Sequence, residues 1–364
     1  MNEPIRVLHV VTYMGLGGLE SMLMNYYRHI DRSKVQFDFL VHRDFKADYD
    51  DEILSLGGKI HHISRLVPWS GKYKNEFKQF LKAHPEYKII HVHQDCLSAV
   101  ALKCAKECGV PVRIAHSHNS NQDKNLKYLV KLFYMRKIPK YATNFFACGK
   151  EAGDWMFKGN EYTILRNAID AESYAYDQKK ADSIKTKLGV ENKLVLGHVG
   201  RFRTQKNHLF LIDIFSAVHQ RNNQSVLLLI GEGETQEETK HRVEEYGLTE
   251  NVIFVGARSD VSLLMQAMDI FVFPSLFEGL PLTMIEAQSS SLPCVISDTI
   301  PDECILVPEL VVKKSLNDDI EEWVNQILNT DLCRKNHIQQ ITNAGYNIKY
   351  QAQELQKFYL NHYK

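Results

Sequence analysis

The stretch that decides the fold is IFVFPSLFEGLPLTMIEA, residues 270–287. Its first four residues are apolar and favour a buried strand, which Pro274 ends. Gly279 permits a tight turn, and Pro281 suits the first turn of a helix, where its missing N–H would have no partner anyway. Apolar residues then recur at helical spacing. The stretch predicts a strand, a loop and a helix N-terminus, whose backbone N–H groups favour an anion such as a nucleotide diphosphate.

Two carboxylates flank this arrangement. Glu278 lies in the loop, and Glu286 lies about two turns along the helix. A carboxylate accepts hydrogen bonds from sugar hydroxyls, so the stretch suits a nucleotide joined to a sugar. A second interpretation stays open, in which Glu278 only flanks the helix start and Glu286 lies on its solvent-exposed face.

Composition and length set the class of protein. The chain has 364 residues, 44% of them hydrophobic, which favours two globular domains. No apolar run approaches the length of a membrane span, and the first residues, MNEP, lack the features of a signal peptide. We therefore expect a cytoplasmic location. Net charge is zero overall, but the first half is basic and the second acidic, which indicates different partners for the two.

Outward from residue 270, short apolar runs alternate with helical patterns in both directions. This βα alternation predicts an α/β fold with two doubly wound, Rossmann-like domains that face a central cleft. We expect a first domain over residues 1–170, a linker over 171–192 and a second domain over 193–347. The amphipathic tail at about 348–364 is expected to pack back on the first domain.

Ligands in such sheets bind at the carboxyl ends of the strands. In the first domain these ends carry a glycine-rich loop and a histidine, and in the second they carry two cations and another glycine loop. Each motif alone has a simpler interpretation as a turn or a surface charge. The candidate residues are Gly17, Gly18, His116, Arg201, Lys206, Gly231 and Gly233.

Residues 124–141 form a basic segment with interleaved apolar residues. Such a helix can lie on an anionic membrane surface, where each cation contributes up to about 1 kcal/mol. The commoner explanation is a solvated helix that covers the sheet.

We predict no metal site. The triplet Asp48-Tyr49-Asp50 lies at an acidic helix start, where its charge suits the helix dipole. His91 and His93 share one face of a strand, and His61 and His62 are adjacent. Neither pair has a third ligand at useful spacing in the sequence.

Together these motifs closely resemble the retaining glycosyltransferases of family 4, which have the GT-B fold. The resemblance covers nearly the whole chain, and its most specific part is the pair Glu278 and Glu286 in its FEGLP context. The run ILRNAID at residues 164–170 looks like the family's linker element, with Arg166 in place of proline and Ala168 in place of glycine. The runs RIAHSHN and SDTIP resemble the exopolysaccharide and capsule branch.

The resemblance implies a role for each candidate residue. Arg201 and Lys206 would hold the donor diphosphate, and His116 would lie near the reacting sugar. Glu278 would bind the donor sugar, Glu286 the ribose, and Arg258 would lie near the base. Backbone groups of Gly17, Gly18, Gly231, Gly233, Gly279, Leu280, Pro281 and Leu282 would approach the phosphates or the sugar.

The implied reaction is transfer of a sugar, with retention, from a nucleotide-sugar to a glycan or lipid-linked glycan. A UDP-sugar is favoured as donor. We expect no metal or other cofactor and no nucleic-acid partner, with possible contact to the inner membrane face through residues 124–141. Two alternatives remain: a nucleotide-sugar epimerase on the same fold, and a non-catalytic nucleotide-sugar-binding subunit of a polysaccharide assembly complex.

Overall fold

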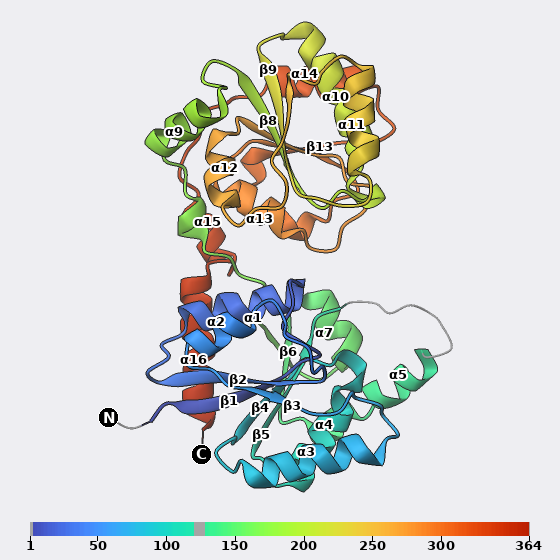
Figure 1. Cartoon of the computed structure of the whole chain (residues 1–364), viewed down its shortest axis with the longest axis vertical. Helices are drawn as coiled ribbons and strands as arrows, with labels where there is room; N and C mark the ends of the chain where they lie inside the picture. The colour runs from blue at the N-terminus through green and yellow to red at the C-terminus, as the bar shows by residue number, and fades with distance from the viewer. Residues whose placement is uncertain (1–2, 120–127, 364) are drawn as a thin grey trace. The chain divides into compact units, whose positions relative to one another are not determined.

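A computed structural model describes residues 3–119 and 128–363 (Figure 1). The chain divides into two compact units. Residues 1–168 and 348–364 form the first unit, and residues 169–347 form the second. Each unit is described by itself below.

Within the described residues, the first unit contains one sheet of seven parallel strands in the order β3-β2-β1-β4-β5-β6-β7. The strands are β1 (Ile5–Val10), β2 (Val35–Val41), β3 (Ile60–His62), β4 (Ile89–Val92), β5 (Val112–Ser117), β6 (Asn144–Ala147) and β7 (Thr163–Ile164). The helices are α1 (Gly18–His29), α2 (Asp50–Ser55), α3 (Gly71–Ala83), α4 (Ser98–Glu107), α5 (Tyr128–Met135), α6 (Ile138–Tyr141), α7 (Lys150–Phe157) and α16 (Ile348–His362), with a short 3-10 turn η1 (Asp95–Leu97).

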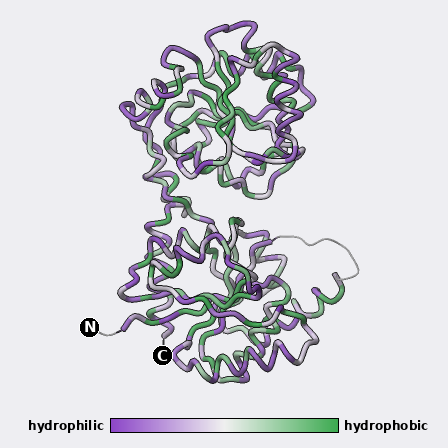
Figure 2. Tube along the Cα trace, viewed as in Figure 1, coloured by the Kyte–Doolittle hydropathy of each residue, from purple (hydrophilic) through white to green (hydrophobic). Residues whose placement is uncertain are grey.

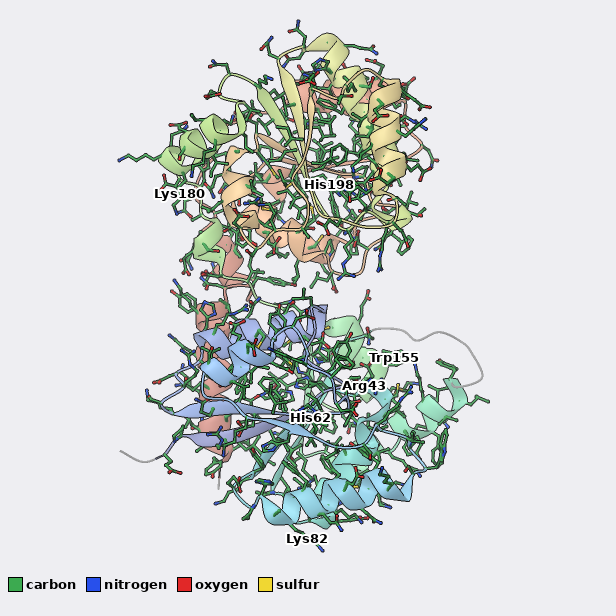
Figure 3. The ribbon with its side chains drawn as sticks, viewed as in Figure 1. Arg43, His62, Lys82, Trp155, Lys180 and His198 are labelled. Atoms are coloured by element: carbon green, nitrogen blue, oxygen red, sulfur yellow. The ribbon has the colours of Figure 1, made fainter. Side chains whose placement is uncertain are left out.

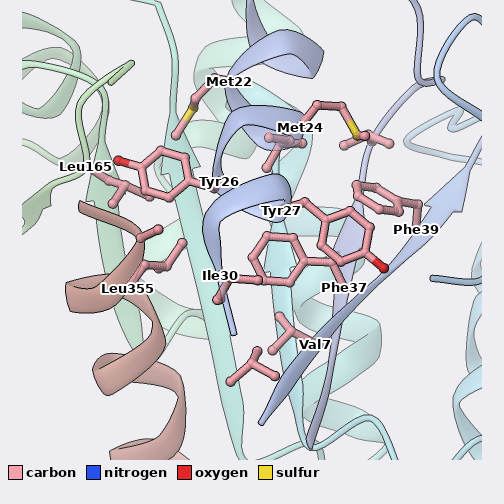
Figure 4. Close-up of a cluster of buried hydrophobic side chains, with 14 of the residues drawn as sticks. Val7, Met22, Met24, Tyr26, Tyr27, Ile30, Phe37, Phe39, Leu165 and Leu355 are labelled. Carbon is pink, nitrogen blue, oxygen red and sulfur yellow. The ribbon is translucent and has the colours of Figure 1, made fainter. Parts of the chain in front are cut away.

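Apolar layers cover both faces of this sheet. On one face α1 and α16 pack against the strands, and Figure 4 shows Tyr27 of α1 beside Phe37 and Phe39 of β2. The opposite face is covered by α3, α4, α6 and α7. Because both faces of the sheet are covered, all seven residues of β2 are buried, including the polar Gln36 and Asp38.

The second unit contains a sheet of six parallel strands within the described residues, in the order β10-β9-β8-β11-β12-β13. The strands are β8 (Leu194–Val199), β9 (Ser225–Ile230), β10 (Val252–Phe254), β11 (Ile270–Phe273), β12 (Cys294–Ser297) and β13 (Val311–Lys314). The helices are α8 (Ala171–Tyr174), α9 (Gln178–Leu188), α10 (His208–Arg221), α11 (Gln236–Glu245), α12 (Val261–Ala267), α13 (Leu282–Ser289), α14 (Ile320–Leu328) and α15 (Ile338–Asn343), with 3-10 turns η2 (Thr204–Lys206), η3 (Asp302–Cys304) and η4 (Pro308–Leu310).

The hydropathy of the chain follows this layering. Figure 2 shows hydrophobic strands at the centre of each unit and mostly hydrophilic helix surfaces around them. In the second unit α12, α13 and α15 cover one face of the sheet, and α10, α11 and α14 cover the other. The structure therefore has the two doubly wound parallel sheets that the βα alternation predicts.

The stretch expected to be a linker has a different structure. Residues 171–192 include α8 and α9, which contact α12 and α13 of the second unit. The polar composition that suggested a connection belongs to the solvent-exposed side of α9, where Lys180 points outward (Figure 3). The tail forms α16 and lies against α1 of the first unit. Among the described helices, none has the length and apolar character needed to cross a membrane.

Candidate donor-binding site

The candidate site in the second unit lies where the strand order reverses. From β8 the chain continues to β9 on one side, whereas β11 pairs with β8 on the other side. Connections on the two sides of such a point diverge, which leaves room for a ligand at the carboxyl ends of the strands. The loops that follow β8 and β11 carry Arg201, Lys206 and Glu278, the charged residues that the sequence analysis singles out.

These two loops are joined by hydrogen bonds. The backbone N–H of Leu276 donates to the carbonyl of Gln205 at 2.8 Å, and the Gln205 side chain donates to the carbonyl of Phe277 at 2.9 Å. The Asn207 amide donates to the carbonyl of Pro274 at 3.2 Å. The loop after β11 is thus held against the loop after β8, although the two are far apart in sequence.

A charged pair lies between the same loops. The Lys206 ammonium donates to the Glu278 carboxylate at 2.7 Å, and the exposed fractions of the two side chains are only 15% and 7%. The ammonium also lies 4.6 Å from the centre of the Phe273 ring. Removal of either charge would leave the other largely buried without its partner, which makes the pair sensitive to substitution.

The N-terminus of α13 has free hydrogen-bonding capacity. Pro281 is the N-cap residue, and no described side chain caps the helix there. The Thr283 hydroxyl in its first turn is buried and has no hydrogen-bond partner among the described residues. Around Gly279 there is open space on the side where a Cβ would lie. The first N–H groups of a helix, together with a hydroxyl that lacks a partner, suit an anion.

Glu286 lies on α13, and its carboxylate is partly buried beside α8. Burial raises the pKa of Glu286 to about 7, while the hydrogen bond from the Tyr174 hydroxyl acts in the opposite direction. A carboxylate that is costly to bury gains most from new hydrogen bonds, such as those that a ribose diol would donate. The structure thus places Glu286 away from the fully solvated helix face that the alternative interpretation assumed.

Among the other candidate residues of the second unit, Gly231 and Arg258 pack against or bond to neighbouring residues of the same unit, and Arg201 is exposed. Gly231 has φ +139°, and a Cβ there would meet the carbonyl oxygen of Gly200 at 2.0 Å, so the loops after β8 and β9 pack through this glycine. Arg258, after β10, forms two contacts of 2.7 Å with Asp260. Arg201 is exposed at the end of β8.

In the first unit the corresponding reversal of strand order lies between β1 and β4. Gly17 is the N-cap of α1, with no described side chain in the capping role, and open space surrounds the Cβ direction of Gly18. His116, by contrast, is fully buried within the sheet layer. The partly buried histidine at this strand end is His118, one pleat further along.

The reason given for excluding a metal does not hold in three dimensions. His91 and His93 lack a third histidine nearby in sequence, but parallel pairing places residues from β1 and β5 beside them. The ring nitrogens of His93, His116 and His118 lie within 4.8 Å of one another, as do those of His9, His91 and His93. Sequence spacing could not reveal this cluster, because the contacts join three separate strands.

All five imidazoles of this cluster are neutral at pH 7. Burial lowers the pKa of His9 and of His118 to about 3, and it lowers the pKa of His91, His93 and His116 well below the usual value.

The triplet Asp48-Tyr49-Asp50 has a local role, since the Asp50 carboxylate accepts a hydrogen bond from the backbone N–H of Ala47 at 2.9 Å.

Known proteins resemble both units. The family described as Glycosyltransferase Family 4 matches residues 16–173, and the family described as Glycosyl transferases group 1 matches residues 180–347. The putative glycosyltransferase EpsF of Bacillus subtilis is 36% identical over 332 residues, which cover 88% of this chain and 86% of that protein. The capsular polysaccharide biosynthesis glycosyltransferase CapH of Staphylococcus aureus is 23% identical over 98% of this chain and 99% of its own length.

Solved structures share the fold. Anabaena Alr3699/HepE in complex with UDP has a TM-score of 0.73 at 18% identity, with 96% of this chain and 94% of that chain covered. A glycosyltransferase from Rickettsia africae has a TM-score of 0.75 at 15% identity over the full length of both chains. The sequence matches over both units and the two parallel sheets agree, and the chain therefore belongs to the family 4 glycosyltransferases with the GT-B fold.

Proposed function

We propose that this glycosyltransferase moves a sugar from a UDP-sugar to a glycan or lipid-linked glycan acceptor in exopolysaccharide or capsule synthesis. Relatives named for capsule synthesis support the pathway class. A relative of 26% identity is named as a UDP-Gal-dependent galactosyltransferase that acts on a diphosphoundecaprenol-linked sugar, and HepE is described in complex with UDP-glucose. These names support a UDP-sugar donor and a lipid-linked acceptor.

The observation that carries the proposal is the arrangement at the start of α13. An uncapped helix N-terminus, the buried Thr283 hydroxyl and the Lys206 ammonium offer donors to a diphosphate from neighbouring loops of one unit. Glu286 follows on the same helix and would accept the two ribose hydroxyls. A diphosphate and a ribose are thereby recognised by groups of the second unit alone.

Lys206 and Glu278 would change partners when the donor binds. Without a ligand the two neutralise each other. In the complex, Lys206 would bind a diphosphate oxygen, and Glu278 would accept hydroxyls of the donor sugar. The pair holds both groups in place before the donor arrives, which lowers the cost of organising the site.

This arrangement favours retention by a front-face route. Double displacement needs a carboxylate that is free to attack the anomeric carbon, whereas Glu278 in the complex would be engaged with hydroxyls of the donor sugar. In the front-face route the departing phosphate takes the acceptor proton as the new bond forms on the same face. Lys206, Arg201 and the α13 N-terminus would stabilise the charge on the leaving diphosphate without a metal ion at that position.

Contact with a membrane surface is proposed for the segment 124–141, of which residues 124–127 lie outside the described residues. On α5 the side chains of Leu129 and Phe133 are 74% and 54% exposed, four residues apart on one face. The Lys137 ammonium lies 3.7 Å from the centre of the Phe133 ring. Exposed apolar side chains beside cations suit the boundary of an anionic membrane. Failure of the full chain to bind anionic vesicles at low salt would contradict this part of the proposal.

The donor is tested by thermal shift with UDP-, GDP-, ADP- and dTDP-sugars. A ligand at 100 times its dissociation constant adds about 2.7 kcal/mol to the free energy of unfolding. We expect stabilisation by UDP-sugars for the wild type and a much smaller shift for Glu286→Ala. Stabilisation by another nucleotide family, or an equal shift in the variant, would refute the assignment. Release of UDP in proportion to transferred sugar separates an enzyme from a non-catalytic binding subunit.

A further inference from the structure

Five histidines form a connected cluster in the first unit, under the helices α1 and α16. His9 lies on β1, His91 and His93 at the end of β4, and His116 and His118 at the end of β5. Residues of a strand that are two apart point to the same face, which places the members of each pair on one side of the sheet. The layer also contains many buried apolar side chains, together with Tyr359, whose hydroxyl contacts His91. The proposed donor site uses none of the five.

Three of these histidines have the spacing of metal ligands. The rings of His93, His116 and His118 each offer one nitrogen, and these nitrogens lie within 4.8 Å of one another. The Nδ1 atom of His93 lies 2.9 Å from Nε2 of His118. In a tetrahedral zinc site with Zn–N bonds of about 2.0–2.1 Å, the ligand nitrogens are about 3.4 Å apart. A small separation and ring rotation would therefore accommodate an ion.

One ligand nitrogen has no other partner. Nε2 of His116 is buried and forms no hydrogen bond with any described residue. A buried polar atom without a partner destabilises the folded state. The cost is removed if this nitrogen binds an ion between the three rings.

The remaining two histidines contact the second ring nitrogen of two of the three ligands. Nε2 of His93 contacts Nδ1 of His9 at 3.1 Å, and Nδ1 of His116 contacts Nε2 of His91 at 3.1 Å. His91 is in turn hydrogen-bonded through Nδ1 to the Tyr359 hydroxyl at 2.7 Å. Ligand histidines in metal sites are oriented by this kind of partner on the second nitrogen.

The geometry also provides access to the site and a nearby carboxyl group. His118 is partly buried, whereas the alternative trio His9, His91 and His93 lies wholly inside the layer. The Asp95 carboxylate accepts hydrogen bonds from the backbone N–H of His118 and from the Asn119 amide. These hydrogen bonds place a carboxyl group beside the backbone of His118.

We propose that His93, His116 and His118 bind one divalent transition-metal ion of the Zn²⁺ class. Three imidazoles that leave one position open are a donor set used for zinc. His9, His91 and Tyr359 orient the ligands, and the ion connects β4 to the residues that follow β5. The proposal concerns the first unit and does not depend on the proposed function.

The test is titration of the chelator-treated full-length chain with Co²⁺, followed by visible absorption and by metal analysis. We expect one Co²⁺ per chain with the strong absorption of a tetrahedral site, displaced by Zn²⁺. His118→Asn should weaken binding by more than about 100-fold. Tyr359→Phe removes an orienting hydroxyl, and an effect of about tenfold is expected.

His62→Asn is the matched control, because His62 is an exposed histidine of the same unit on β3 (Figure 3). Circular dichroism establishes that each variant is folded. Binding by the wild type and His62→Asn, but not by His118→Asn, supports the site. Absence of stoichiometric Co²⁺ binding, or equal loss in both histidine variants, would overturn the proposal and leave a metal-free hydrogen-bonded network.

Discussion

The two units have the same doubly wound topology but place their polar groups differently around the reversal of strand order. At β8 and β11 the second unit carries Lys206 and Glu278 in loops beyond the strand ends. At β1 and β4 the first unit carries His9 and His91 within the strands, under helices that exclude water. In the proposed function the loops of the second unit exchange partners with a ligand, whereas His9 and His91 belong to the buried layer of the first unit.

The two regions differ in which property of the protein is reduced when one of their residues is replaced. A core residue contributes through burial, so its replacement mainly affects stability. A loop residue at a helix N-terminus contributes through charge presented to a ligand, so its replacement mainly affects binding and rate. The comparison therefore predicts separable effects on stability and function, which the following variants test in order of decreasing expected size.

Phe37→Ala should have the largest effect on stability. Phe37 is fully buried in the first unit, where its ring stacks with Tyr27 at a centroid distance of 5.2 Å. We expect the free energy of unfolding of this unit to fall by about 3–5 kcal/mol. Hydrogen exchange of the β1 and β2 amides measures this fall in the free energy of unfolding. The control Phe277→Ala, whose side chain is 63% exposed, should change stability by no more than about 0.5 kcal/mol. Equal losses of stability in the two variants would contradict the predicted difference between the buried and the exposed residue.

Lys206→Ala should have the largest effect on catalysis. Loss of the ammonium removes a cation from the leaving diphosphate and leaves Glu278 without its partner. We expect a fall in rate of about 10²–10³-fold, measured as nucleoside diphosphate released from the donor. Lys180→Ala, on the exposed side of α9, is the matched control and should keep the wild-type rate. A Lys206→Ala variant with full activity would remove this residue from the site.

Donor affinity should depend on pH through Glu286. Its carboxyl pKa is about 7, and only the ionised form accepts both ribose hydroxyls. The ionised fraction rises about tenfold between pH 6 and pH 8, so the affinity for a UDP-sugar should rise by about the same factor. Calorimetric titration at both pH values measures this. Glu286→Gln should bind weakly with little pH dependence, and a wild type with flat affinity would contradict the assigned role.

The same carboxyl group should act on stability with the opposite trend. Its pKa is higher in the folded chain than the usual 4.5, so the folded state binds the proton more tightly. The stability that the folded chain gains from the protonated Glu286 carboxyl is complete below pH 4.5 and is lost as the pH rises toward 7. Without ligand, the wild type should therefore lose stability relative to Glu286→Gln as the pH rises over this range.

Tyr174→Phe should give the smallest effect. The Tyr174 hydroxyl donates a hydrogen bond that favours the ionised Glu286. Its removal should shift the midpoint of UDP-sugar binding to higher pH, with affinity at pH 7 lowered by a few-fold. Affinity at pH 9 should approach that of the wild type. A uniform loss at all pH values would indicate that Tyr174 acts on the ligand directly.

Much of the fold, and several residues that meet at the candidate site of the second unit, could be predicted from the sequence. The strand at 270–273, the loop and the helix from residue 282 follow local rules of apolar runs, proline and glycine. Glu278 and Lys206 could be singled out because each follows a strand end. Their direct contact could not, since it joins residues 72 apart in the sequence and depends on the pairing of β11 with β8.

Composition and local spacing were a poor guide to the structure of three parts of the chain. Residues 171–192 are polar because α9 is amphipathic with a narrow buried side, not because they connect two domains. His116 and His118 are separated by one residue, and the sequence does not show which of them lies at the surface. The histidine cluster was missed because its contacts cross three strands and no local motif brings these residues together.

The most direct test of the donor site is a crystal structure of the chain with a bound UDP-sugar. We expect the diphosphate at the N-terminus of α13 and within hydrogen-bond distance of Lys206, with the ribose hydroxyls on Glu286. The Lys206–Glu278 contact should be shared with or replaced by contacts to the donor. A nucleotide bound elsewhere, with the α13 N-terminus and Glu286 untouched, would contradict the site proposed here.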